Sequence, residues 1–142
     1  METIVIKGRG VVAGRVEGEA LVCPHSITGW GGIDPVTGVI LEYGNINRGR
    51  SIKDKVFVLP GSKGSNGWSC YFGAARVAGA APIGWLISKI DSSSGVACAV
   101  MHIPAVVDFN DKEDPCRLIE TGDWVRMDGI TGMIEVRKKC RE

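Results

Sequence analysis

One stretch of the sequence, residues 55–87, carries a pattern that few folds accommodate. Residues 55–60 form a short apolar run typical of a buried strand, and a glycine-rich turn follows at 61–67. Apolar side chains then recur at three- and four-residue spacing over 68–79, which predicts a helix, and 83–87 is a second buried run. Strand, helix and strand within about thirty residues predict a βαβ crossover, in which both strands lie parallel in one sheet.

The segments on either side of this unit also have strand or helix patterns, separated by glycine and polar turns. They are strands at 3–7, 11–13, 16–22 and 103–108, a short helix capped by 92–94 and running to 100, and a C-terminal β-hairpin within 120–136 whose turn contains Asp128-Gly129. At 142 residues the chain has the size of one domain. We therefore expect a single α/β domain over 1–142, built in three layers with extra β-ribbon.

Charge and hydropathy exclude several classes of protein. The net charge is +1, so no basic field indicates a nucleic-acid partner. The longest apolar run, 78–87, is interrupted by glycine and proline and is too short to span a bilayer. Residues 1–7 lack the apolar stretch of a signal peptide. We expect a cytoplasmic protein that contacts neither nucleic acid nor membrane.

The residue types that bind metals are scattered. Five cysteines lie far apart without a C-x-x-C pair, which favours incidental thiols over disulfides or a metal site. The carboxylates of residues 108–114 offer ligands for a divalent cation, but Lys112 and Pro115 among them are more typical of a solvated loop. His25 and His102 have no spaced partners, so structural roles are favoured for both. The residues therefore predict no metal on this chain.

The turn at 61–67 is the candidate site. Unpaired N–H groups in the first turn of a helix carry partial positive charge and bind phosphate or carboxylate. Glycines in this turn permit close approach of a ligand, Lys63 adds a full charge, and the turn follows the carboxyl end of a strand, where α/β folds bind ligands. It does not match a P-loop. The alternative is an ordinary helix start, with Ser65 or Asn66 as its cap. A second glycine-rich stretch, 28–32, is expected either beside this turn or as a tight turn with Trp30 in the core.

Several segments resemble, in order along nearly the whole chain, the small subunit of aconitase X. They are 16–22, 30–38, 55–60 with the turn after it, 119–123 and 132–136.

This resemblance implies a swivelling β/β/α domain that pairs with a large subunit as a heterodimer. In the family the large subunit holds an iron–sulfur cluster through its own cysteines, so this chain alone is expected to bind no cofactor. The small subunit supplies a serine as the catalytic base, in a pattern close to Gly-Arg-Gly-Ser. That pattern falls on Ser62-Lys63-Gly64-Ser65, which implies Ser65 as the base, with Ser62 as the alternative. Ser62, Lys63, Gly64 and Asn66 are then expected to bind the substrate.

The sequence departs from the family pattern at two places, with lysine in place of arginine at 63 and a different continuation at 66–68. A short cationic site suits an amino-acid carboxylate, whereas a phosphorylated substrate would favour more arginine. We therefore expect the hydroxyproline type of the family, a hydro-lyase that dehydrates cis-3-hydroxy-L-proline to a pyrroline-2-carboxylate. The alternative is the small subunit of a phosphomevalonate dehydratase.

Two readings without dehydratase chemistry remain. One is a non-catalytic swivelling carrier like the phosphohistidine domains, which would need a histidine beside a small-residue turn, and His102 precedes Ile103-Pro104 instead. The other is an interaction module that binds a partner tightly and performs no chemistry.

Overall fold

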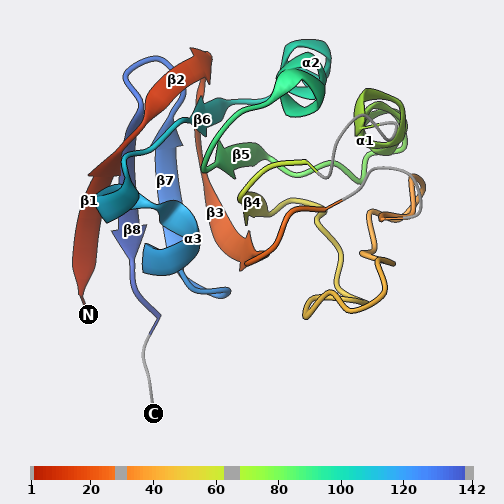
Figure 1. Cartoon of the computed structure of the whole chain (residues 1–142), viewed down its shortest axis with the longest axis horizontal. Coiled ribbons are helices and arrows are strands. Elements are labelled where there is room, and N and C mark those ends of the chain that lie inside the picture. Colours follow the sequence, from red (N-terminus) through yellow and green to blue (C-terminus); the bar gives the residue numbers. More distant parts are fainter. Residues whose placement is uncertain (1, 28–31, 63–67, 140–142) are drawn as a thin grey trace.

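The structure, a computed structural model, describes residues 2–27, 32–62 and 68–139. Eight strands hydrogen-bond in the order β1-β8-β7-β3-β4-β5-β6-β2 (Figure 1). The strands are β1 (Thr3–Lys7), β2 (Arg9–Val12), β3 (Arg15–Val22), β4 (Val56–Leu59), β5 (Gly84–Ile87), β6 (Ala105–Val107), β7 (Trp124–Asp128) and β8 (Met133–Arg137). The helices are α1 (Trp68–Val77), α2 (Ser92–Met101), the 3₁₀ turn η1 (Asp111–Glu113) and α3 (Pro115–Leu118).

The predicted βαβ unit is present. Strands β4 and β5 are parallel and are joined through α1, and β5 and β6 are parallel and are joined through α2. The two helices pack against each other over one face of these strands (Figure 1). Four aromatic rings fill the space between helices and sheet, with centroids 4.9–6.3 Å apart. They belong to Phe57, Trp68, Phe72 and Trp85. All four side chains are buried, which accounts for the apolar spacing seen in the sequence.

The opposite face of the parallel strands is covered by the antiparallel strands. β3 belongs to both parts, because Arg15–Glu19 pair with β7 whereas Ala20–Val22 pair with β4. Alternate residues of β4, Val56 and Val58, pack into a second core that also holds Val125 and Val136. Helices, parallel strands and antiparallel strands thus form three layers. The predicted β/β/α architecture is confirmed.

Glycines allow the ends of the sheet to approach closely. The N–H of Gly8 donates to the carbonyl of Gly132 at 3.0 Å, and that of Gly129 to the carbonyl of Gly14 at 2.8 Å. A side chain at Gly129 or Gly132 would overlap a backbone carbonyl of the facing segment, and Gly132 has a φ of +80°. The predicted hairpin is confirmed, but its turn extends to Gly132 because the carboxylate of Asp128 accepts the N–H of Ile130 at 2.8 Å.

One sequence prediction about a polar segment was wrong. The α2 helix is capped by Asp91 and not by the serines that follow, because its carboxylate accepts the N–H of Ser94 while the Ser94 hydroxyl accepts the N–H of Asp91. Residues 108–115, expected as a solvated loop, contain the 3₁₀ turn η1, none of whose residues is buried, and the start of α3. Their acidic and amide side chains serve as caps, since Asn110 caps η1 and Asp114 caps α3. None of the described helices has the length and apolar character required to cross a membrane.

Candidate functional site

The candidate site lies at the edge of the sheet where β3, β4, β5 and β6 end. Because these four strands are parallel, their carboxyl ends share one edge. The 61–67 segment follows β4, residues 88–91 follow β5, and residues 108–110 follow β6. Within these connections Ser62, Asp91 and Asp108 are the polar side chains that link one strand end to the next.

Ser62 is joined to Asp91 by two hydrogen bonds. The Ser62 hydroxyl donates to Oδ2 of Asp91 at 2.7 Å, and the Ser62 N–H donates to the same oxygen at 3.2 Å. The other oxygen, Oδ1, accepts the N–H and the hydroxyl of Ser94, both at 2.8 Å. One carboxylate therefore holds both the start of the candidate segment and the first turn of α2.

These contacts also fix the charge of Asp91. Partial burial opposes ionisation, but the donors of Ser94 and Ser62 outweigh it and lower the pKa of Asp91 below its usual value. Asp91 is therefore a carboxylate at neutral pH.

A third strand end is tied to the same region by Asp108. Its Oδ1 accepts the N–H of Ile90 at 2.9 Å, and its Oδ2 is paired with the guanidinium of Arg9 at 2.5 Å. Asp108 has a φ of +57°, a conformation that aspartate tolerates better than most residues. Burial opposes ionisation of Asp108, yet Arg9 and the Ile90 N–H lower its pKa. Asp108 thus positions the residue that precedes Asp91.

Ile27 contacts the described residues on both sides of 63–67, which are Ser62 and Trp68. Ile27 and Ser62 form a parallel bridge, with the Ile27 N–H 3.4 Å from the carbonyl of Gly61. At the other end of the segment, the indole N–H of Trp68 donates to the carbonyl of Ile27 at 2.8 Å. The residues that flank the two glycine-rich stretches of the sequence are therefore in contact.

Most of the predicted site residues lie outside the described residues. These are Lys63, Gly64, Ser65 and Asn66, together with Trp30 of the second glycine-rich stretch. Ser62 is described and is half-buried. Sequence reasoning missed Asp91, and it considered Asp108 only as a possible cation ligand. The spacing of Asp91 and Ser94 is that of a capping box and offered a signal for Asp91. Asp108 offered none, because its partners come from distant parts of the chain.

A hollow lies beside the residues that follow the carboxyl end of β3. It measures about 320 Å³ and is lined by His25 and Glu42 among others. His25 is exposed, whereas the side chain of Glu42 is buried. His102 is exposed too, but it is the C-cap of α2, so a ten-residue helix separates it from Asp91. The rise of such a helix is about 15 Å.

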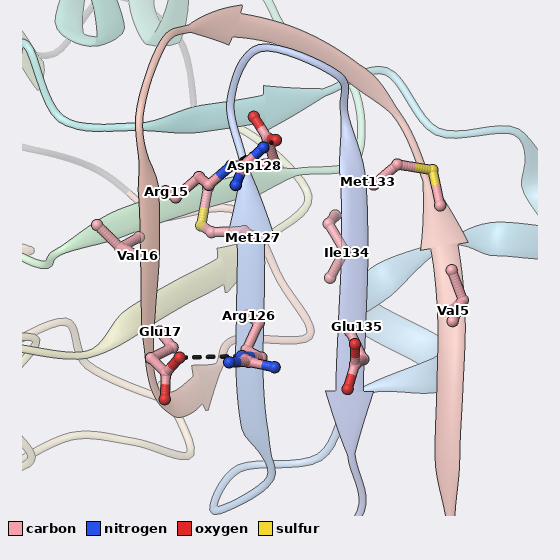
Figure 2. A pocket seen from close by; sticks show the side chains of 10 residues that line it. All are labelled: Val5, Arg15, Val16, Glu17, Arg126, Met127, Asp128, Met133, Ile134 and Glu135. Carbon is pink, nitrogen blue, oxygen red and sulfur yellow. Dashed lines mark hydrogen bonds and ion pairs between the residues drawn. The ribbon is translucent and has the colours of Figure 1, made fainter.

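A larger hollow lies elsewhere in the described structure. About 550 Å³ in volume, it lies over β3, β7, β8 and β1 (Figure 2). Four of its five charged side chains form ion pairs, Arg15 with Asp128 at 3.1 Å and Arg126 with Glu17 at 2.9 Å, and the fifth is Glu135. Because most of the charge along this hollow is already paired, the strand-end region is the better candidate for chemistry.

Three described cysteines, Cys23, Cys98 and Cys116, have a raised pKa and are therefore protonated thiols at neutral pH. Burial raises the pKa of Cys98 to about 11 and that of Cys116 to about 11, and it raises that of Cys23 as well. Cys70 is exposed. Over residues 2–27, 32–62 and 68–139, three or more histidine, cysteine, aspartate or glutamate side chains do not gather where they could hold a metal ion.

Comparison with known proteins adds the family. Residues 5–136 match the family described as the aconitase X swivel domain. The phosphomevalonate dehydratase small subunit of Methanocella arvoryzae is 34% identical over 131 residues, covering 92% of this chain and 98% of that protein. The protein of the same name from Methanosarcina acetivorans is 35% identical over 138 residues, covering 97% and 94%. The crystal structure of aconitase X from Thermococcus kodakaraensis in its holo-form matches with a TM-score of 0.86 and 29% identity, over 95% of this chain and 99% of that chain.

Proposed function

The chain belongs to the aconitase X swivel domain family, and from that premise we propose that it is the small subunit of a two-chain dehydratase. The observation that carries this proposal is full-length similarity to proteins named as small subunits of a dehydratase. In this proposal the enzyme is a hydro-lyase, and it is active only when a large subunit completes the site.

Phosphomevalonate is the proposed substrate, in place of the cis-3-hydroxy-L-proline expected from the sequence. The relatives reported above carry the former name, and their similarity extends over nearly the whole of both chains. The chain's own residues suit an anionic substrate. The first turn of α1 contains no acidic residue, so the partial positive charge of its N-terminus is not neutralised there. Lys63, five residues earlier, adds a full positive charge. The similarity to these relatives is therefore a stronger argument than the expectation that a phosphorylated substrate would favour more arginine.

Ser65 is the proposed base. Dehydration of a hydroxy acid requires loss of a proton from the carbon next to the carboxylate while the hydroxyl leaves the neighbouring carbon. A serine hydroxyl takes that proton only as an alkoxide, which needs N–H donors and a cation in a water-poor site. Backbone N–H groups of the 61–67 segment and the ammonium of Lys63 are proposed to supply them, while Ser62, Gly64 and Asn66 contact the substrate.

The iron–sulfur cluster of the family is assigned to the large subunit, as the resemblance implies. When bound there, it supplies a Lewis acid for the leaving hydroxyl. No step is assigned to the cysteines of this chain.

The test is an assay of the reconstituted pair. The chain is co-expressed with the aconitase X large subunit of the same genome, and dehydration of phosphomevalonate and of cis-3-hydroxy-L-proline is measured. Ser65→Ala is expected to lower kcat by a factor of about 10²–10⁴ with the cluster still loaded. Ser51→Ala is the matched control, because Ser51 precedes β4 whereas the candidate segment follows it. Among the described residues, the Ser51 hydroxyl donates to the carbonyl of Thr37 and accepts the N–H of Lys53.

The results separate the parts of the proposal. Turnover of hydroxyproline alone would replace the substrate and keep the enzyme class. Near-native turnover by Ser65→Ala in a loaded complex would remove Ser65 as the base. Failure of the two chains to associate would remove the proposal as a whole.

A further inference from the structure

We propose that Asp91 is a positioning residue of the dehydratase site, which fixes Ser62 and through it the entry to the segment that carries the proposed base. This inference rests on the proposed function. In it, Asp91 touches neither substrate nor reacting atoms, and Ser62 holds the segment in addition to its proposed contact with the substrate.

The geometry gives Asp91 two separable tasks. Through Oδ1 it caps α2, accepting the N–H of Ser94 at 2.8 Å. Through Oδ2 it accepts both the N–H and the hydroxyl of Ser62. Both donors of Ser62 converge on one oxygen, so the backbone and the side chain of that residue are oriented together. Such two-point attachment restrains direction as well as position.

The surroundings hold Asp91 itself in place. Ile90, the preceding residue, donates its N–H to Asp108, and Lys89 donates its N–H to the carbonyl of Pro60 at 3.2 Å. Gly61 allows the two strand ends to come this close, because a side chain there would lie 3.1 Å from the carbonyl of Lys89. Asp91 is therefore presented by a backbone that is anchored on both neighbouring strands.

The same contact argues against Ser62 as the base. Removal of the Ser62 proton would leave an alkoxide 2.7 Å from a carboxylate, and two adjacent anions repel strongly. The low pKa of Asp91 also makes its carboxylate a poor acceptor for that proton. Of the two serines in the predicted motif, Ser62 is thus the donor that holds the segment, and Ser65 is left for the chemistry.

Asp91→Asn separates the two tasks. Asparagine caps helices as well as aspartate does, so α2 keeps its cap. With its amide oxygen on Ser94, the amide nitrogen faces Ser62, and the Ser62 N–H loses its acceptor. Asp114→Asn is the matched control. Asp114 also caps a helix and accepts a serine hydroxyl at 2.7 Å, but its partner is Ser88 and its helix is α3.

The experiment has one structural and one kinetic readout. In the full chain, amide hydrogen exchange at Ser62 is expected to become at least about tenfold faster in Asp91→Asn and to stay unchanged in Asp114→Asn. In the loaded two-chain complex, Asp91→Asn and Ser62→Ala are each expected to lower kcat about tenfold, since small displacements of a catalytic group have effects of this order or larger. The double variant should be clearly less impaired than the product of the two single effects, because both changes act on the one Ser62–Asp91 contact.

The contrary results are distinct. Unchanged kcat in Asp91→Asn, or a double variant about a hundredfold slower than wild type, overturns the positioning role. Loss of more than about a thousandfold in Ser62→Ala alone makes Ser62 the base and also overturns it. If the wild-type complex dehydrates neither substrate, the proposed function fails. In that case the Ser62 exchange rate still decides whether Asp91 holds the segment, and unchanged exchange overturns the inference.

Discussion

The indole N–H of Trp68 donates to the backbone carbonyl of Ile27 at 2.8 Å, although 41 residues separate them in the chain. Trp68 is the first residue of α1, and Ile27 is also bridged to Ser62. The backbone of one residue thus contacts both the residue before and the residue after 63–67. The proposed site segment is fixed at its two ends by a partner from the β3–β4 connection, which explains why a buried tryptophan begins the helix.

Replacing Trp68 tests the contribution of its hydrogen bond to Ile27. Trp68→Phe keeps an aromatic ring in the core but removes the only N–H donor of the side chain, so the Ile27 carbonyl loses this bond. We expect unfolding in urea to become easier by about 2 kcal/mol. Trp124→Phe is the control, because Trp124 is 42% exposed and its bond to Glu17 lies on the surface. It should change stability by less than about 0.5 kcal/mol. Equal losses in both variants would contradict the structural role of the Trp68–Ile27 bond.

Asp123 predicts a dependence of stability on pH. Its side chain has no exposure to solvent, and it accepts the ammonium of Lys138 at 2.6 Å and the N–H groups of Glu120 and Lys139, both at 2.8 Å. Burial opposes ionisation, but these donors prevail and lower the pKa of Asp123 below its usual value. A group whose pKa is lowered by folding stabilises the protein above the unfolded pKa of about 3.9, and that contribution is lost as the pH falls through the folded pKa.

We therefore expect Asp123→Asn to lower the free energy of unfolding by about 3 kcal/mol at neutral pH. The difference from wild type should shrink once the pH drops below about 4, as measured by chemical unfolding at several pH values. Glu17→Gln removes an exposed ion pair with Arg126 and should have a much smaller effect that salt abolishes. A pH-independent difference for Asp123→Asn would be inconsistent with the charge-based account.

The close approach of the β7–β8 turn to the end of β2 depends on glycine at 129. Its backbone faces the carbonyl of Val12 so closely that a methyl group does not fit. Gly129→Ala is expected to cost about 3 kcal/mol or more, because the obstacle is backbone and cannot move aside. Gly73→Ala is the matched change. Gly73 lies inside α1 with nothing within 4 Å of the added methyl, and alanine there should stabilise by roughly 0.5–1 kcal/mol. Thermal unfolding of both variants measures the contrast, and equal midpoints would refute it.

Variants that change the charge at residue 63 test whether Lys63 binds an anionic substrate. In the two-chain enzyme, Lys63→Met is expected to lower kcat/KM for phosphomevalonate by about ten- to a hundredfold, as for loss of one charge-assisted hydrogen bond. Lys63→Arg should retain most of the activity, since guanidinium binds phosphate well. Lys112→Met, on the exposed η1 turn, changes the net charge equally and should leave kcat/KM unaltered. Equal activity of the methionine variants would show that Lys63 does not contact the substrate.

Elements whose signal is local were predicted well from the sequence. The runs at 55–60 and 83–87 became β4 and β5 because both faces of these strands are covered, which leaves an unbroken apolar pattern. The helix at 68–79 was found from its spacing, although its last residues, Ala78 and Gly79, are exposed and lie beyond α1. The start of α2 was misplaced because three serines outweighed Asp91 as capping candidates.

The contacts of the candidate site required tertiary information. Ser62 was identified from its motif, but its partner Asp91 lies 29 residues further along the chain, and no spacing rule links them. The same holds for Asp108, which reaches Ile90 and Arg9 across two strand ends. The hydroxyproline expectation rested on a short cationic turn with lysine in place of arginine at 63, which is a weak discriminator between two anionic substrates.

By itself the sequence determined which segments are strands and helices and where a glycine-rich turn follows a buried strand, because apolar periodicity and turn chemistry act over a few residues. Only the tertiary structure decided that β3 pairs with both the antiparallel and the parallel strands and that Asp91 holds Ser62. It also placed Ile27 in contact with both Ser62 and Trp68, the residues on either side of 63–67. Those relationships arise when parallel strands bring distant connections to one edge, where side chains far apart in the chain satisfy one another's hydrogen bonds.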